Sequence, residues 1–279
     1  MESIFNSPNP ILFGIGAAQR TGSELKKLGC KKVLVVFDKG VEQAGVAERV
    51  MKAIREAGIE TVVYNNVQAD PPIWSVEEAG ALGTANHVDG VVGIGGGSSL
   101  DSAKAVSAYA ANDVTIDELL AVPPVVRAQL PNIMIPTTSG TGSESTMVAV
   151  ITNTKTHYKT GVFANPAFAI VDPELELGLG EDITRYTGLD ALSHANEALC
   201  SDFTENPMAD VIAYDAFDRI CHWLPVALKD PSNLEAREQL AIASNGAGRA
   251  FTNAATHLGH AIALPALLDV GGKATPEGS

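Results

Sequence analysis

Cysteine is scarce in this chain of 279 residues, and its three cysteines, Cys30, Cys200 and Cys221, show no CxxC spacing. Zinc sites built from cysteines and dithiol redox sites use that spacing, so we expect three reduced thiols and neither kind of site. Long hydrophobic runs are also missing, since no stretch reaches the roughly 18 apolar residues of a membrane span. The first residues lack the basic segment and apolar run of a secretory signal. These absences predict a cytoplasmic protein with no membrane segment.

Basic residues are outnumbered, with 19 Lys and Arg against 33 Asp and Glu and a net charge of −14. This balance argues against binding to nucleic acid or to an anionic membrane surface, because both require basic patches. It does not exclude a ligand that carries phosphate, because the backbone amides at a helix N-terminus bind one without any net positive charge. The 46% hydrophobic and 19% charged residues are typical of a globular protein.

Strand and helix patterns alternate from about residue 11 to residue 180. Apolar, β-branched runs predict strands, and helical spacing of apolar residues predicts helices between them. The expected strands are residues 32–37, 61–64, 90–94, 131–135 and 167–171, and the expected helices between them are 46–57 and 75–86. Such alternation predicts a mostly parallel sheet with helices on both faces.

The pattern changes after about Leu177, where no further strand is expected. Residues 184–201, 207–228 and 233–263 are rich in Ala, Leu, Glu and Arg, and Pro, Asn and Ser separate them. We therefore predict an α/β domain at residues 1–180 and an all-α domain at residues 181–279.

A glycine-rich loop, Gly95-Gly96-Gly97-Ser98, lies between a predicted strand and the start of a helix. Glycines let backbone N–H groups approach an anion, and the helix adds its unpaired donors and its positive end, so a diphosphate fits this loop. The GxGxxG fingerprint is incomplete because Ser98 replaces the third glycine, and no Gly-Lys-Ser/Thr of a Walker A loop follows. A tight turn capped by Ser98 or Asp101 is the alternative interpretation.

A second loop, Ile135–Glu144, places hydroxyl groups and glycines at another strand end. Ligands of open α/β sheets bind at the carboxyl ends of strands, so the two loops together predict a nucleotide site. Asp38 also follows a strand, where a carboxylate accepts hydrogen bonds from a ribose 2′-OH and repels a 2′-phosphate. This favours NAD over NADP, although an aspartate that only forms a turn is equally compatible with the sequence.

Asp190 and His194 lie four residues apart and therefore share one face of a predicted helix. A carboxylate and an imidazole so arranged form half of a divalent-metal site, which His257 and His260 could complete. An Asp–His hydrogen bond near a helix start is the alternative. Glu197, one turn beyond His194, is either a group behind the ligands or a solvated side chain.

Four motifs in this order resemble the iron-dependent alcohol dehydrogenases, which share the dehydroquinate-synthase-like fold. They are Gly95–Ala105 (GGGSSLDSAKA), Ile135–Glu144 (IPTTSGTGSE), Ala169–Leu175 (AIVDPEL) and Thr187–Ala198 (TGLDALSHANEA). The resemblance covers about residues 8–263. It implies a nucleotide-binding domain, a helical domain and a cleft between them. The implied reaction is hydride transfer between an alcohol and its aldehyde or ketone, without a protein nucleophile.

The resemblance also implies the site residues and the partners. The cofactor-binding residues that it implies, together with the glycine loop, are Asp38, Gly95, Gly96, Gly97, Ser98, Asp101, Thr137, Thr138, Thr141 and Lys159. The implied metal ligands are Asp190, His194 and His260. The cofactors are NAD rather than NADP and a divalent metal, with Fe²⁺ expected before Zn²⁺, although this donor set also suits Mn²⁺. The expected assembly is a homo-oligomer, a dimer or larger.

The sequence departs from the family after His260. Leu264 stands where the family has a second histidine, and Thr275-Pro276-Glu277-Gly278 is the nearest equivalent of its Pro-His-Gly, whose histidine is the fourth ligand. Glu277 offers an oxygen donor at that place. The departure leaves a second hypothesis open, a homologue that binds NAD but whose metal site is degenerate. A non-redox lyase of the dehydroquinate-synthase kind is a third.

Overall fold

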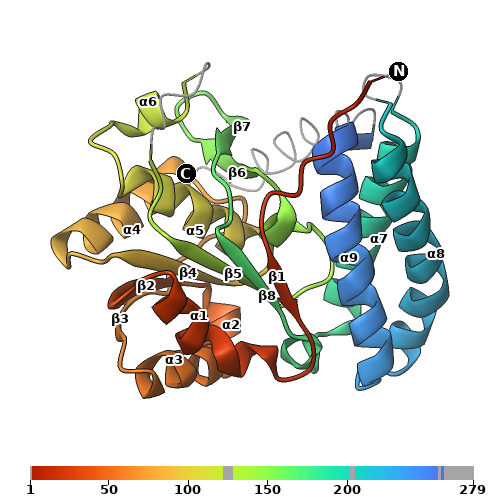
Figure 1. The fold of residues 1–279 in the computed structure, drawn as a ribbon, viewed down its shortest axis with the longest axis horizontal. Coiled ribbons are helices and arrows are strands. Elements are labelled where there is room, and N and C mark those ends of the chain that lie inside the picture. The colour runs from red at the N-terminus through yellow and green to blue at the C-terminus, as the bar shows by residue number, and fades with distance from the viewer. Residues whose placement is uncertain (1, 122–127, 202–204, 257–258, 261–279) are drawn as a thin grey trace, which may run out of the picture.

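A six-stranded sheet forms the centre of the chain up to residue 171 (Figure 1). The computed structural model describes residues 2–121, 128–201, 205–256 and 259–260. The strands lie in the order β1-β8-β5-β4-β2-β3, and every neighbouring pair is parallel. Their bounds are Ile11–Phe13 (β1), Lys32–Val36 (β2), Glu60–Tyr64 (β3), Gly90–Gly95 (β4), Asn132–Pro136 (β5) and Phe168–Val171 (β8).

Helices cover both faces of the sheet (Figure 1). On one face lie α1 (Thr21–Lys27), α2 (Lys39–Gln43) and α3 (Val46–Glu56), and on the other lie α4 (Ile73–Ala85) and α5 (Gly97–Tyr109), which the short α6 (Ile116–Leu119) follows. Strand β2 contributes to both layers, because successive side chains of a strand point to opposite faces. Val33 and Val35 belong to the core under α3, and Leu34 and Val36 belong to the core under α4 and α5.

The connections of β2 and β4 create a crevice at the carboxyl end of the sheet. These two strands are neighbours, but β2 continues through α3 on one face and β4 continues through α5 on the other. The loops that follow them therefore separate, and ligands of open α/β sheets bind at such a switch point. Asp38 and the glycine loop are the segments that follow these two strands.

Three long helices form a separate layer beside the sheet (Figure 1). They are α7 (Glu181–Leu199), α8 (Pro207–Lys229) and α9 (Leu234–Ala254). The side chains of Asn206 and Asn233 cap α8 and α9 by accepting hydrogen bonds from the backbone N–H groups of Ala209 and Ala236. The predicted fold class is confirmed, because helices alone follow β8 in the described part of the chain. A domain boundary near residue 180 stays a prediction.

Besides short elements that were not predicted, such as β1 and α1, two larger features differ from the expectation. The predicted helix 233–263 is too long, because α9 ends at Ala254 and Ala255 has a left-handed φ of 64°. An antiparallel hairpin, β6 (Val148–Asn153) and β7 (Tyr158–Phe163), was not predicted, and it lies apart from the main sheet.

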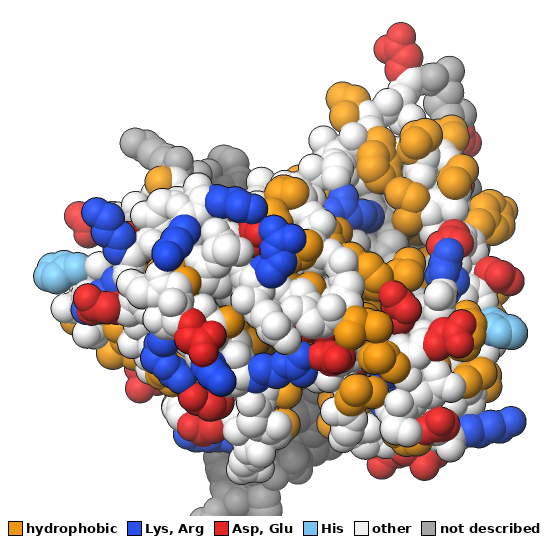
Figure 2. Space-filling model, turned by 60° about the horizontal axis from the view of Figure 1, so that its bottom comes forward, with side chains coloured by type: hydrophobic (Ala, Val, Ile, Leu, Met, Phe, Trp, Pro, Cys, Tyr) orange, Lys and Arg blue, Asp and Glu red, His pale blue; other side chains and the backbone are white. Residues whose placement is uncertain are grey.

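The surface of the helical layer carries exposed apolar side chains, whereas charges of both signs are interspersed over the sheet domain (Figure 2). Met208, Val211 and Tyr214 recur every three residues along α8 and are all more than half exposed. Among the described helices, none combines the length and the apolar character that a membrane crossing requires.

Candidate functional site

The glycine loop places unpaired backbone donors at the switch point. Helix α5 begins at Gly97, and its N-cap residue, Gly96, supplies no side-chain hydrogen bond to the first turn. The N–H groups of that turn are therefore available to an anion. A Cβ added at Gly97 would lie 2.6 Å from Thr141 Cγ2, and Gly95 has a φ of +142°. The loop thus needs glycine both for its close contact with the second loop and for its backbone conformation.

A cavity of about 820 Å³ lies over this loop and is called here the strand-end cavity. It is lined by Asp38, by Gly96 to Ser99 and by Thr137 and Thr138, with apolar residues such as Val41 and Leu175. Asp38 performs the turn-forming role that the sequence allowed, because its Oδ1 accepts a hydrogen bond of 3.0 Å from Val41 N. Its Oδ2 accepts one of 3.1 Å from Ser99 Oγ, which fixes the carboxylate at the edge of the cavity.

A second cavity of about 810 Å³, called here the cleft cavity, lies between the sheet and the helical layer. Gly97 and Ser98 line both cavities, so the glycine loop lies where the two meet. Asp101, Thr141 and Lys159 line the cleft cavity together with Asp190, His194 and His260. Of the ten predicted cofactor-binding residues, only Gly95 lines neither cavity; it is buried at the end of β4.

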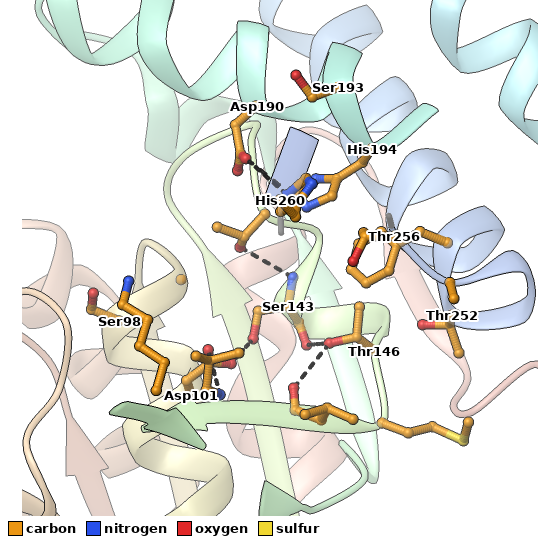
Figure 3. Close-up of a pocket in the computed structure, with 18 of the residues that line it drawn as sticks. Ser98, Asp101, Ser143, Thr146, Asp190, Ser193, His194, Thr252, Thr256 and His260 are labelled. Carbon is orange, nitrogen blue, oxygen red and sulfur yellow. Dashed lines mark hydrogen bonds and ion pairs between the residues drawn. The ribbon is translucent and has the colours of Figure 1, made fainter. Parts of the chain in front are cut away.

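Asp101 ties helix α5 to the second loop and to the hairpin. Its Oδ1 accepts a hydrogen bond of 2.6 Å from Ser143 Oγ, and its Oδ2 accepts one of 3.0 Å from Val150 N. Its Oδ1 also lies 3.1 Å from Nζ of Lys104, which is fully buried. Burial lowers the pKa of Lys104, and the carboxylate of Asp101 opposes that shift. This network holds the floor of the cleft cavity in one arrangement (Figure 3).

The three predicted metal ligands converge on one point (Figure 3). Asp190 and His194 come from α7, and His260 reaches them from beyond the end of α9. Asp190 Oδ1 lies 3.9 Å from His194 Nε2 and 3.7 Å from His260 Nε2, and one donor atom from each residue lies within 4.8 Å of the others. The two imidazole rings stack with centroids 4.5 Å apart.

The electrostatics of the trio suit a cation. Burial lowers the pKa of His194, which favours the neutral imidazole that a metal requires, and Asp190 opposes this shift. Nδ1 of His194 is buried, and the backbone of Gly140 also opposes the shift. The pKa of His260 is raised by the nearby carboxylate of Asp190 and by its hydrogen bond to Glu197, against burial. One carboxylate oxygen and two imidazole nitrogens form a donor set that fits Fe²⁺ or Zn²⁺.

Glu197 is the group behind His260 that the sequence left undecided. Its Oε1 accepts a hydrogen bond of 2.7 Å from Nδ1 of His260, and its side chain is only 6% exposed, so it is not a solvated glutamate. A methyl group at Gly259 would collide with this same oxygen. The alternative of an isolated Asp190–His194 hydrogen bond does not hold, because their nearest charged atoms lie 3.9 Å apart.

Three of the residues considered in the sequence cannot be placed, and two residues of the cleft cavity were not predicted. His257, Leu264 and Glu277 lie outside the described residues. The hairpin residues Val148 and Phe163 line the cleft cavity and were missed. The alternation in residues 148–153 and 158–163, around the polar turn Thr154-Lys155-Thr156, is the signal that could have found them.

Family models, related sequences and solved structures all relate this chain to alcohol dehydrogenases or similar oxidoreductases. A family model described as iron-containing alcohol dehydrogenase matches residues 8–173, and the model of the C-terminal part of that family matches residues 184–270. A choline dehydrogenase of Bacillus subtilis is 37% identical over 92% of this chain. An NAD-dependent methanol dehydrogenase of Bacillus methanolicus is 39% identical over 94% of it. The chain spans 65% and 69% of the lengths of these two proteins.

The fold of this chain is also similar to that of solved structures. The sulfoacetaldehyde reductase of Bifidobacterium kashiwanohense, in complex with NAD⁺, is 34% identical to this chain with a TM-score of 0.91. The match covers 98% of this chain and 72% of that one.

Proposed function

Because the chain belongs to the iron-containing alcohol dehydrogenase family, we propose that it interconverts an alcohol and its aldehyde or ketone, with NAD as the hydride carrier. One observation carries the proposal. Gly97 and Ser98 line two cavities, one bordered by Asp38 and the other by Asp190, His194 and His260. A dinucleotide with its diphosphate at Gly97 and Ser98 extends one end into each cavity.

The cofactor-binding role follows from the chemistry of these residues. The backbone N–H groups from Gly96 to Ser98 bind the diphosphate, because they are the unpaired donors of α5. Asp38 accepts a hydrogen bond from the adenosine ribose, and its negative charge repels a 2′-phosphate, which favours NAD over NADP. Thr137 and Thr138 contact the adenosine side, and Asp101, Thr141 and Lys159 border the nicotinamide side.

Asp190, His194 and His260 are the residues that would hold a divalent metal, and the family name favours Fe²⁺. Such an ion, when bound, supplies a Lewis acid that makes the alcohol hydroxyl more acidic. The residues around it prepare the reaction. Glu197 keeps the Nδ1 proton of His260 engaged, which directs Nε2 toward Asp190. Phe251 stacks on His194 with centroids 4.4 Å apart and holds the ring in place.

The experiment that tests the proposal measures turnover and cofactor binding separately. The chain is loaded with Fe²⁺ without oxygen, or with Zn²⁺, and the formation of NADH from a series of primary alcohols is followed by absorbance. We expect turnover that chelation abolishes and that the metal restores. His194→Ala should lower turnover by at least about 100-fold, because a Lewis acid contributes several kcal/mol, while NADH still binds, as its fluorescence reports.

His222→Ala serves as the control, because His222 lies on α8 and lines neither cavity. Its turnover should equal that of the wild type. A chain that binds NADH and stays inactive with either metal would contradict the proposed activity and support the hypothesis of a degenerate homologue. A chain that fails to bind NADH would overturn the cofactor assignment.

A further inference from the structure

The charged side chains that line the cleft cavity are paired with opposite charges or surround the candidate metal site. Its acidic residues are Asp70, Asp101, Asp190 and Glu197, and Lys159 is the only lysine or arginine among the described residues that line it. Asp190 and Glu197 surround the histidine pair and together match the charge of a divalent ion. Asp101 is paired with Lys104, 3.1 Å away.

Of the two lysines named above, only Lys159 lines the cavity, so only its charge could pair with a substrate. Its side chain, on β7, is 12% exposed, so the ammonium group is not turned toward solvent. Nζ donates to Oδ1 of Asp70 at 2.6 Å. Asp70 belongs to the segment between β3 and α4, has a left-handed φ of 49°, and lies at the rim of the cavity with 59% of its side chain exposed. The ion pair therefore spans two segments of the cavity wall and uses the positive charge of Lys159.

From this balance we infer that the cleft cavity takes uncharged alcohols and aldehydes and rejects anionic ones, and that Asp70 is a specificity-determining residue. The inference deepens the proposed function and rests on it. With the neutral nicotinamide of NADH in place, an anionic group in this cavity would lose its hydration without gaining a counter-ion, and it would face carboxylates on several sides. The apolar side chains of Met147, Val148 and Phe251 offer an uncharged chain the burial that it prefers.

The test compares two alcohols of similar shape and different charge. They are 3,3-dimethylbutan-1-ol, which is uncharged, and 2-hydroxyethanesulfonate, which ends in a tetrahedral anionic group instead of a tert-butyl group. For the metal-loaded enzyme with NAD⁺, we expect kcat/KM to be about 100-fold or more in favour of the uncharged alcohol, because unfavourable charge contacts cost several kcal/mol. Equal values for the two alcohols would overturn the inference.

Asp70→Asn tests the role of the ion pair. The substitution frees the charge of Lys159, so the preference for the uncharged alcohol should shrink at least tenfold. A ratio of two substrates measured on one variant cancels any change in cofactor binding. The control is Asp117→Asn, which removes the same charge from the Asp117–Lys155 pair, also 2.6 Å long, at the exposed turn of the same hairpin. Asp117 does not line the cavity, and its ratio should stay that of the wild type.

A binding measurement separates this inference from the proposed activity. Titration calorimetry of the enzyme–NADH complex with each alcohol gives the same comparison without turnover. If no alcohol is oxidised but the uncharged one still binds preferentially, the activity is wrong and the charge selection stands. If both bind alike, or if Asp70→Asn and Asp117→Asn behave alike, the charge selection is wrong whatever the activity.

Discussion

Glu197 acts on the metal site through His260. Its carboxylate accepts the Nδ1 proton of His260, and both side chains lie in the interior of the cleft. Carboxylates behind a histidine ligand fix the tautomer and the direction of the ring, and their removal typically costs 10- to 100-fold in metal affinity. We therefore expect Glu197→Gln to weaken the binding of Zn²⁺ or Fe²⁺ by about that factor.

The measurement is competition for the metal with a chromophoric chelator. The matched control is Glu181→Gln, which removes an exposed carboxylate that pairs with Arg185 at the start of the same helix. Equal metal affinities for the two variants would show that the contact with His260 is structural only.

The positions of candidate site residues could be predicted from the sequence, but the hydrogen bonds of their side chains could not. Asp38, Gly97 and Asp190 could be placed because each follows a strand or lies in a periodic helix. The hydrogen bonds of Asp38 to Val41 and Ser99 could not be foreseen, since a carboxylate that caps a helix and one that awaits a ribose occur in the same local pattern. Lys159 could be aligned by resemblance, but its partner Asp70 lies 89 residues away in the chain.

Among the elements, the buried strands were the most predictable. Strand β4 is apolar throughout and β2 is apolar after Lys32, because both faces of a parallel sheet are covered. The hairpin of β6 and β7 alternates between buried and exposed residues, which is a weaker signal. The end of α9 was missed because alanine-rich composition continues past Ala254, while the backbone turns away through a positive φ at Ala255.

The loop after β5 depends on a close contact with α9. Gly142 has a φ of +61°, and a Cβ added there would lie 2.7 Å from Cα of Gly248 and 2.8 Å from the carbonyl oxygen of Ser244. An alanine would meet both left-handed strain, roughly 1–2 kcal/mol, and overpacking, roughly 1–3 kcal/mol. We expect Gly142→Ala to lower the free energy of unfolding by about 2–5 kcal/mol, measured by urea denaturation.

Gly178→Ala isolates the conformational strain, and its difference from Gly142→Ala gives the steric part of that effect. Gly178 has a φ of +93°, but a Cβ added there would meet nothing within 4 Å. This variant should show the conformational strain alone, about 1–2 kcal/mol. Equal losses at the two positions would mean that the contact between the loop and α9 contributes nothing to stability.

At the scale of the whole molecule, a buried carboxylate lies between the sheet domain and the helical layer and interacts with residues of both. Glu176, in the 3-10 turn Pro173–Glu176, is 2% exposed and accepts a hydrogen bond from Ser139 Oγ at 2.8 Å. Burial raises its pKa from 4.5 to about 7, although Ser139 and the guanidinium of Arg237 on α9 oppose the shift. The folded protein therefore binds this proton more tightly than the unfolded chain does.

The sign of the resulting pH dependence is fixed by that difference. Between pH 4.5 and about 7 the folded state holds more protons than the unfolded state, so stability falls as the pH rises through this window. A shift of this size corresponds to about 3 kcal/mol. Glu176→Gln retains the shape and the contact with Ser139 but cannot ionise. Its stability relative to the wild type should rise by about 2–3 kcal/mol between pH 5 and pH 8, measured by urea denaturation at both values.

Ser139→Ala tests the same linkage from the other side. Its hydroxyl is the largest influence that lowers the pKa of Glu176, so its removal should raise that pKa further and steepen the loss of stability above neutral pH. In a Glu176→Gln background the same substitution should change stability equally at pH 5 and pH 8, because no proton is exchanged there. A pH-dependent effect of Ser139→Ala in that background would locate the titrating group elsewhere than at this junction.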